Sequence, residues 1–248
     1  MNNKILKIGV SAALTRGRSI HLDTFERAVD LATKYIFDDR RVSLIWADDL
    51  ATYEGGKRAA TELVISGVDI VVGHYASASA KGALAVYGEA CIPLLMPAAT
   101  ADSLTQSYKF GFRVCGKDSD LVKFIVEVLT RKQVKRILLQ KDESFHGQVV
   151  FDCLSKMLVN KVEVITSYEE GLLMVSDIIF VGTYTNSICF VNELEKNKKR
   201  NYNVYLTDDA LHPSLISDLK TAMGVFIFGY KSPHDVISAK MCVEQYRR

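Results

Sequence analysis

The hydrophobic positions of the chain follow two alternating patterns. Short, mainly apolar runs are each followed by a longer stretch whose apolar residues recur at helical spacing. The run Ile5–Val10, for example, precedes a stretch in which Phe25, Val29 and Ala32 lie on one helical face. Strands that are apolar on both faces and alternate with amphipathic helices are typical of parallel sheets covered on both sides. The pattern therefore predicts an α/β fold with parallel sheets flanked by helices.

Nine strands are predicted in this way, which is more than one small sheet requires. They are Ile5–Val10, Val42–Ala47, Asp69–Gly73, Ile92–Met96, Val134–Gln140, Val162–Thr166, Asp177–Gly182, Asn203–Leu206 and Val225–Gly229. Polar, glycine-containing breaks at residues 113–120 and 229–235 bracket a central block. We therefore expect two lobes, an N-terminal one of residues 1–116 with 231–248 and a C-terminal one of residues 117–230. The final residues, 235–248, have a helical pattern.

The composition of the 248 residues is ordinary, with 48% hydrophobic residues and a formal net charge of +2. A charge this small provides no strong field to recruit nucleic acid or a membrane surface. A secretory signal needs an apolar core of about 7–15 residues, and Lys7 interrupts the N-terminal apolar run. No apolar run is long enough to span a bilayer. We therefore expect a cytoplasmic protein without membrane insertion or a nucleic-acid partner.

Cysteines and histidines give no sign of a metal centre or a catalytic set. The five cysteines have no CxxC spacing, which favours reduced thiols; they are Cys91, Cys115, Cys153, Cys189 and Cys242. The histidines do not pair at metal-binding spacing, and there is no GxSxG or Walker motif. We interpret His74 as a structural hydrogen-bonding group, and His146 and His212 as able to face a ligand. The sequence thus predicts no metal and no cofactor, and it favours a binding protein over an enzyme.

Small hydroxyl residues follow two neighbouring predicted strands. Ser77, in "GHYAS", is expected at or beside the N-cap of a helix, and Thr100, in "MPAAT", is expected to open the next helix with help from Asp102 and Ser103. Open parallel sheets bind ligands at the carboxyl ends of their strands, and helix N-termini suit anions. The two hydroxyl residues therefore either form a site for a small carboxylate or only cap their helices.

The chain resembles the leucine/isoleucine/valine-binding proteins, two-lobed periplasmic solute-binding proteins of type I. The resemblance is carried by "GVDIVVGHYASASAKGALAVYGEACIPLLMPAATADSLTQ", and also by "ADDLATYEGGKRAATELVISG", "RVCGKDSDLVKFIVEVL", "FVGTYTNS" and "VYLTDDALHPSL". It extends over about residues 4–230. It implies a protein that clamps a small amino acid between its two lobes.

The resemblance also assigns site residues. In the family, a Ser and a Thr with nearby backbone groups hold the ligand carboxylate, while the other lobe supplies an aromatic wall and an acid for the ammonium group. The six positions that match here are Ser77, Ala98, Thr100, Phe145, Tyr184 and Asp208. The family acid is usually Glu, so Asp208 is one methylene shorter, and Phe145 stands where Tyr is common.

Three departures from the family pattern accompany the resemblance. No signal peptide is expected, and the positions of the family's small disulfide hold Ala51 and Ala76. The third departure is a loss of sequence at two places. The segment "TSYEEGLLMVSD" is expected to be too short for the helix usually found between its two strands, and the sequence stops at Arg248, where relatives continue with further elements of the first lobe. We therefore expect exposed apolar surface on that lobe, covered by a homodimer contact or another protein partner.

The function expected from these observations is binding of a small amino acid or amide-like ligand in a cleft between the lobes, by a cytoplasmic solute-binding or sensor protein. Two alternatives stay open at this point. One is an enzyme of a small-metabolite pathway that reuses the same cleft. The other is a substrate-binding protein of an ABC transporter whose true start codon lies upstream.

Overall fold

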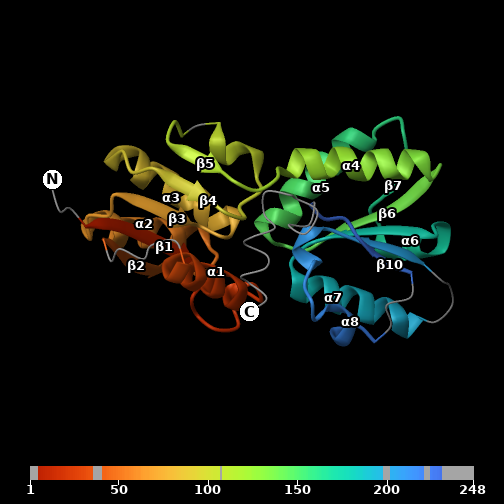
Figure 1. Ribbon diagram of the computed structural model, residues 1–248. Coiled ribbons are helices and arrows are strands. Elements are labelled where there is room, and N and C mark those ends of the chain that lie inside the picture. Colours follow the sequence, from red (N-terminus) through yellow and green to blue (C-terminus); the bar gives the residue numbers. More distant parts are fainter. Residues whose placement is uncertain (1–4, 36–40, 107, 198–201, 221–223, 231–248) are drawn as a thin grey trace. The chain divides into compact units, whose positions relative to one another are not determined.

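The protein divides into two compact units that are both α/β. The structure, a computed structural model, describes residues 5–35, 41–106, 108–197, 202–220 and 224–230. The first unit comprises residues 1–116 with 231–248, and the second comprises residues 117–230. Each unit contains one five-stranded sheet in which all neighbouring strands are parallel (Figure 1). The α/β class with parallel sheets and flanking helices, expected from the sequence, is confirmed.

The sheet of the first unit has the order β2-β1-β3-β4-β5. Its strands are β1 (Leu6–Ala12), β2 (Val42–Asp48), β3 (Ile70–Gly73), β4 (Leu94–Met96) and β5 (Gly111–Arg113). The helices are α1 (Leu22–Tyr35), α2 (Tyr53–Ile65) and α3 (Ser77–Ala90), with a 3-10 helix, η1 (Asp102–Thr105). The central strand β1 pairs with β2 on one side and β3 on the other, so that Ile8 lies opposite Leu44 and Ile70. The ends of β3 and β4 lie side by side, which brings the segments that follow them to one edge of the sheet.

Helices α2 and α3 pack closely, because glycines stand at their contact. A Cβ atom on Gly56 would lie 2.0 Å from the carbonyl oxygen of Ser79, and one on Gly82 would lie 2.0 Å from that of Tyr53. Only residues without a side chain allow this approach of two helix backbones. The contact fixes the N-terminal turn of α3, where Ser77 lies.

The sheet of the second unit has the order β10-β9-β8-β6-β7. Its strands are β6 (Arg136–Lys141), β7 (Glu163–Ile165), β8 (Asp177–Val181), β9 (Asn203–Leu206) and β10 (Val225–Ile227). The helices are α4 (Asp118–Arg131), α5 (Phe145–Leu158), α6 (Tyr168–Met174), α7 (Tyr184–Leu194) and α8 (Leu215–Asp218), with the 3-10 helices η2 (Glu195–Asn197) and η3 (Asp208–Ala210).

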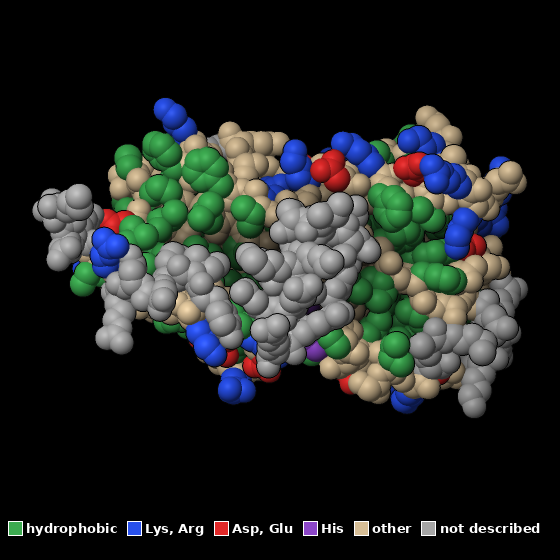
Figure 2. Space-filling view, viewed as in Figure 1, with side chains coloured by type: hydrophobic (Ala, Val, Ile, Leu, Met, Phe, Trp, Pro, Cys, Tyr) green, Lys and Arg blue, Asp and Glu red, His purple; other side chains and the backbone are tan. Residues whose placement is uncertain are grey.

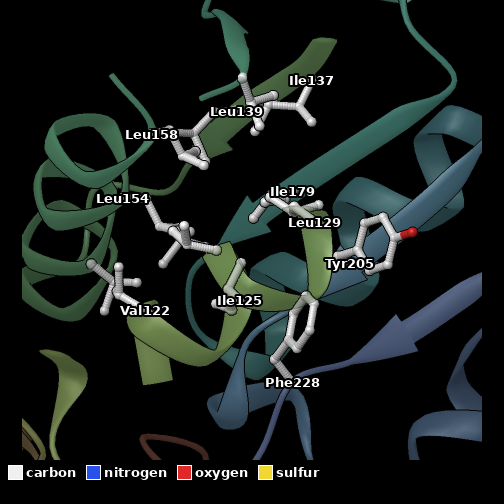
Figure 3. Close-up of a cluster of buried hydrophobic side chains, with 14 of the residues drawn as sticks. Val122, Ile125, Leu129, Ile137, Leu139, Leu154, Leu158, Ile179, Tyr205 and Phe228 are labelled. Carbon is white, nitrogen blue, oxygen red and sulfur yellow. The ribbon is translucent and has the colours of Figure 1, made fainter. Parts of the chain in front are cut away.

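Hydrophobic clusters cover both faces of this second sheet, which explains why consecutive residues in the middle of β6 are apolar. Ile137 and Leu139 of β6 point toward a cluster formed with α4 and α5, which includes Ile125 and Leu154 (Figure 3). Leu138, between them in sequence, points to the opposite face and packs in a cluster with α7 and α8. Successive side chains of a strand alternate between faces, so a strand buried on both faces needs an apolar residue at every position.

Two local expectations from the sequence are wrong. The strand β5 was not expected, since it is only three residues long and has no apolar run. The segment between β7 and β8 does hold a helix, the seven-residue α6. It fits because Gly171 lies against Leu138, where a Cβ atom would come within 2.5 Å of that side chain. The helical pattern expected over residues 235–248 lies outside the described residues.

Apolar side chains are exposed along β5, which stands at the end of the first sheet. Phe110, Phe112 and Val114 are 37%, 50% and 71% exposed. Figure 2 shows hydrophobic side chains gathered at the surface of the first unit. Exposed groups of this kind often mark an interaction surface.

Candidate functional site

The first group of candidate residues lies at the carboxyl edge of the first sheet. Ser77 is the first residue of α3, and Thr100 lies in the loop after β4; both are buried, while Ala98 is half-buried. The Oγ of Ser77 accepts a hydrogen bond of 3.2 Å from the backbone N–H of Ala101. That bond uses a lone pair of the hydroxyl and leaves its proton available for an acceptor. Within the described part of the chain the side chain of Thr100 makes no hydrogen bond.

Neither hydroxyl acts as a helix cap. The N-cap of α3 is Ala76 and that of η1 is Ala101, and no side chain caps either helix. Thr100 therefore precedes η1 and does not open it, contrary to the expectation from the sequence. The first intrahelical bond of α3 runs from the N–H of Ala80 to the carbonyl of Ala76. The N–H groups ahead of it have no acceptor in the helix, which makes this end of α3 suited to an anion.

Behind this edge lies a buried polar network centred on His74. Its Nδ1 is 2.8 Å from Asp49 Oδ2, its Nε2 is 3.1 Å from the hydroxyl of Tyr87, and all three residues are buried. Ser11 Oγ lies 3.1 Å from Nδ1, the nitrogen that already faces Asp49. A nucleophilic serine needs the opposite ring nitrogen and access to substrate, and neither is present here. The network ties the ends of β1, β2 and β3 to α3, in agreement with the structural role expected for His74.

The carboxyl edge of the second sheet is held by Asp142, at the end of β6. Its carboxylate accepts hydrogen bonds from the backbone and hydroxyl of Ser144 and of Thr183 and from the amide of Asn186. Burial alone would raise the pKa of Asp142, but the bonds from Asn186, Ser144 and Thr183 together lower it. Ser144 is in turn the N-cap of α5, with its Oγ 2.9 Å from the N–H of Gly147. Asp142 thus fixes the first turn of α5.

The side chain that this turn presents to Asp208 is that of His146. Its Nε2 lies 3.6 Å from Asp208 Oδ1, and its Nδ1 lies 3.8 Å from Oδ1 of Asp118, the first residue of α4. Asp118 is 2% exposed, whereas the side chains of His146 and Asp208 are each 17% exposed. Two carboxylates and an imidazole from three different elements therefore meet at one place in the second unit.

Burial raises the pKa of Asp208 to about 6. The nearby carboxylates of Asp118 and Asp209 act in the same direction, while His146 opposes them. A buried carboxylate in this position is stabilised by a cation, whether from the protein or from a ligand.

The two predicted aromatic residues lie in different surroundings. Phe145 is the first residue of α5 and is half-buried. Tyr184 is 5% exposed and belongs to the hydrophobic cluster beneath α7, with its hydroxyl 2.6 Å from Asp218 Oδ2 and its ring against His212. Sequence reasoning placed His146 among residues able to face a ligand but did not single out Asp118. The sequence feature that could have identified Asp118 is its position in "GKDSD", directly before an apolar helical pattern.

Other features bear on the chemistry. Among the residues that the structure describes, no group of three His, Cys, Asp or Glu side chains could hold a metal ion. In the same ranges no helix combines the length and apolar character needed to cross a membrane. Cys91, Cys115, Cys153 and Cys189 are free thiols, and Cys242 lies outside the described residues.

Solved structures with the same fold are binding proteins for small molecules. A leucine binding protein, LivK, from Thermotoga maritima superposes with a TM-score of 0.87 at 21% identity, covering 98% of this chain and 75% of that one. The branched-chain amino acid transporter substrate binding protein LivJ from Streptococcus pneumoniae, in complex with isoleucine, gives a TM-score of 0.83 at 21% identity, covering 98% and 77%. At such identities these likenesses establish the fold, which is that of type I periplasmic binding proteins.

Curated relatives match over part of their length. The Leu/Ile/Val-binding protein homolog 3 of Brucella melitensis is 27% identical over 163 residues, which are 63% of this chain and 44% of the relative. An amino acid binding protein of Pseudomonas aeruginosa is 31% identical over 176 residues, which are 66% of this chain and 46% of the relative. The chain thus spans less than half the length of these relatives.

The sequence profile of a family described as periplasmic binding protein matches residues 5–165, well over half of the chain. This match and the Leu/Ile/Val-binding relatives overturn the cytoplasmic location expected from the sequence, because the family is one of periplasmic solute-binding proteins. That expectation rested on the absence of an apolar signal segment near residue 7, which was the wrong guide. The resemblance seen in the strand-end motifs is confirmed: the chain belongs to the periplasmic binding protein family.

Proposed function

We propose that this protein binds a small apolar amino acid of the leucine, isoleucine and valine group and presents it to a transporter. The observation that carries the proposal is the arrangement at Ser77. Its hydroxyl accepts the N–H of Ala101, keeps its own proton for an acceptor, and stands at the open N-terminus of α3. An amino-acid carboxylate would find a hydroxyl donor, backbone donors and a favourable helix dipole there.

The second unit holds a candidate partner for an ammonium group. Asp208 is largely buried, and its Oδ1 accepts no hydrogen bond from the part of the chain that the structure describes. An ammonium group would satisfy that oxygen in a charge-assisted hydrogen bond. Ala98 and Thr100 would complete the carboxylate site, and Phe145 would contact the ligand side chain. Tyr184 would contribute only the edge of its ring, because its hydroxyl is bonded to Asp218.

The names of the relatives support an amino acid as the ligand. Several are Leu/Ile/Val-binding proteins, and the solved structures include transporter binding proteins in complex with isoleucine and with leucine. A role in transport follows the same names. A sensor role, and the amide-like ligand also considered from the sequence, remain predictions without an observation that favours them over an amino acid.

The test is calorimetry with leucine and with its keto acid, which lacks the ammonium group. Asp208→Asn removes one charge-assisted hydrogen bond, worth about 1.5–3 kcal/mol, so leucine affinity should fall by about ten- to a hundredfold. The keto acid should bind the variant as well as it binds the parent, or better. Ser77→Ala should weaken both ligands less, because backbone donors remain.

Asp120→Asn serves as the matched control, because Asp120 is an exposed acid that pairs with Lys123. It should leave both affinities unchanged. If Asp208→Asn binds leucine as well as the parent does, the assignment of Asp208 is wrong. If the parent protein binds none of the three amino acids, the proposed function is wrong.

We also propose that a second copy of the chain covers the apolar side chains of β5. The support is the exposure of Phe110, Phe112 and Val114 at the end of the first sheet. Sedimentation should then show a dimer that Phe112→Glu converts to a monomer. A parent protein that stays monomeric at high concentration would contradict this contact.

A further inference from the structure

The imidazole of His146 bridges two acids through its two nitrogens. Nδ1 faces Asp118 at 3.8 Å and Nε2 faces Asp208 at 3.6 Å. These separations are those of ion pairs and are longer than hydrogen bonds. Neither Nε2 of His146 nor Oδ1 of Asp208 has a hydrogen-bond partner in the described ranges. The two contacts therefore depend on the charge of the ring.

The charge of the ring decides whether both contacts are favourable. A neutral imidazole has one N–H, so it can offer a proton to only one of the two carboxylates. The imidazolium ion has two N–H groups and a positive charge, so it suits both. Because the acids are largely buried, each depends on a nearby cation more than an exposed acid does.

Other charged groups around the bridge come from the elements packed against it. Asp209 follows Asp208, and its Oδ2 lies 3.1 Å from the N–H of Tyr184. At the start of α4, Lys117 is exposed and precedes Asp118.

Just before α5, the carboxylate of Asp142 accepts hydrogen bonds from Ser144, Thr183 and Asn186. Lys141 lies 3.7 Å from the exposed Glu143. His212, after η3, packs against the ring of Tyr184. Among the described residues, His146 is an ionisable base that lies within ion-pair distance of both acids.

We propose that His146 is an internal counter-cation for Asp208 that the ammonium group of a ligand replaces. In its protonated form the ring holds Asp118 and Asp208 together and favours ligands that have a carboxylate but no ammonium group. In its neutral form it leaves Asp208 to the ammonium group of an amino acid. This inference rests on the proposed function, since it deepens the role of Asp208, and it makes the choice between the two ligand classes depend on pH.

The proposal has a consequence for proton binding. An amino acid that replaces the imidazolium at Asp208 must lower the proton affinity of His146, because two cations would otherwise share one acid. For one linked proton, the affinity for the amino acid changes by at most about tenfold per pH unit, falling on the acid side. A keto acid brings no competing cation, so it should not lower the proton affinity of the ring.

The bridge is tested without any ligand, by NMR titration of the histidine ring protons of the full chain between about pH 5 and 8. The His146 signal is identified as the one missing from His146→Gln. Removing one neighbouring negative charge with Asp118→Asn should move the midpoint of that signal to lower pH. Asp208→Asn gives a second, independent measurement with the same expected sign. Asp120→Asn, in the same first turn of α4, should leave the midpoint unchanged.

The ligand part is tested by repeating the titration with saturating leucine and with its keto acid. Leucine should move the His146 midpoint to lower pH, and the keto acid should leave it unchanged or move it upward. The other histidines are internal controls. The bridge is refuted if neither Asp→Asn variant lowers the His146 midpoint. The exchange, in which the ammonium group of the ligand replaces the imidazolium at Asp208, is refuted if leucine leaves that midpoint unchanged or raises it. Failure of leucine, isoleucine and valine alike to bind refutes the proposed function and the exchange together, while the ligand-free titrations still decide the bridge.

Discussion

Tyr87→Phe is the sharpest test of the polar network behind the edge of the first sheet. Tyr87 and His74 are both 0% exposed, and the tyrosine hydroxyl is 3.1 Å from Nε2 of the histidine. Burial raises the pKa of Tyr87, so the hydroxyl keeps its proton and can donate it to the ring while Nδ1 faces Asp49. The substitution removes one oxygen atom and leaves Nε2 buried without a partner.

The cost follows from that single lost partner. An unsatisfied buried polar atom costs about 1–3 kcal/mol, and the change of shape is too small to add a large cavity. With about 2 kcal/mol lost and a urea m-value of about 2 kcal/mol/M, the unfolding midpoint should fall by about 1 M. The slope should not change, since the variant exposes the same surface on unfolding.

Fluorescence of Trp46 is the assay, because it is the one tryptophan of the sequence and lies in β2 of the first unit. Tyr53→Phe is the matched control, since Tyr53 lies in α2 of the same unit and is 49% exposed. Its free energy of unfolding should change by no more than about 0.5 kcal/mol, as is usual for surface changes. If Tyr87→Phe shifts the midpoint no further than Tyr53→Phe does, the network does not stabilise this edge and the reasoning is refuted.

Two further predictions concern residues that support the carboxyl edges of the two sheets. Asp142→Asn should destabilise the second unit by about 2–3 kcal/mol in urea unfolding at neutral pH, because the carboxylate accepts several hydrogen bonds as an anion. Since the pKa of Asp142 is lowered in the folded state, its contribution is present above the unfolded pKa and is lost as pH falls through the folded pKa. The parent should therefore lose more stability on acidification than the variant, and equal losses would contradict the assignment. Gly56→Ala should lower the free energy of unfolding by about 1–3 kcal/mol or more, because its Cβ would lie 2.0 Å from the Ser79 carbonyl oxygen. The control Gly88→Ala in α3 should be neutral or stabilising, because its Cβ would meet only Tyr108, at 3.8 Å. Similar thermal melts for the two variants would refute the close helix contact.

Much of the fold could be predicted from the sequence because the pattern that sets it is local. A strand buried on both faces must be apolar at every position, as Ile137, Leu138 and Leu139 are in β6, and a helix on a sheet must be apolar on one face. Elements without such a pattern were missed or misjudged. The strand β5 has three residues and pairs only because β4 lies beside it, and α6 forms in a short segment because Gly171 lets it lie close to Leu138.

The candidate site was predictable in part. Strand-end motifs identified Ser77 and Thr100, since a hydroxyl at the end of a parallel strand has a limited set of roles. Their hydrogen bonds were not predictable: the N–H that Ser77 accepts belongs to Ala101, which the fold brings next to it from 24 residues away. The location of the protein was predicted wrongly, because an apolar segment near the first residue is a weak guide when the rest of the sequence belongs to a periplasmic family.

The sequence by itself determined the periodicity, and hence two parallel sheets with helices on them and the strand ends where a ligand would bind. Only the tertiary structure decided which side chains meet at those ends. His146, Asp118 and Asp208 lie on three elements separated by 28 and 62 residues, and nothing local in any of them indicates the other two. Their contact depends on the order of the strands and on the turn that Asp142 holds, and these arise from packing over the whole unit.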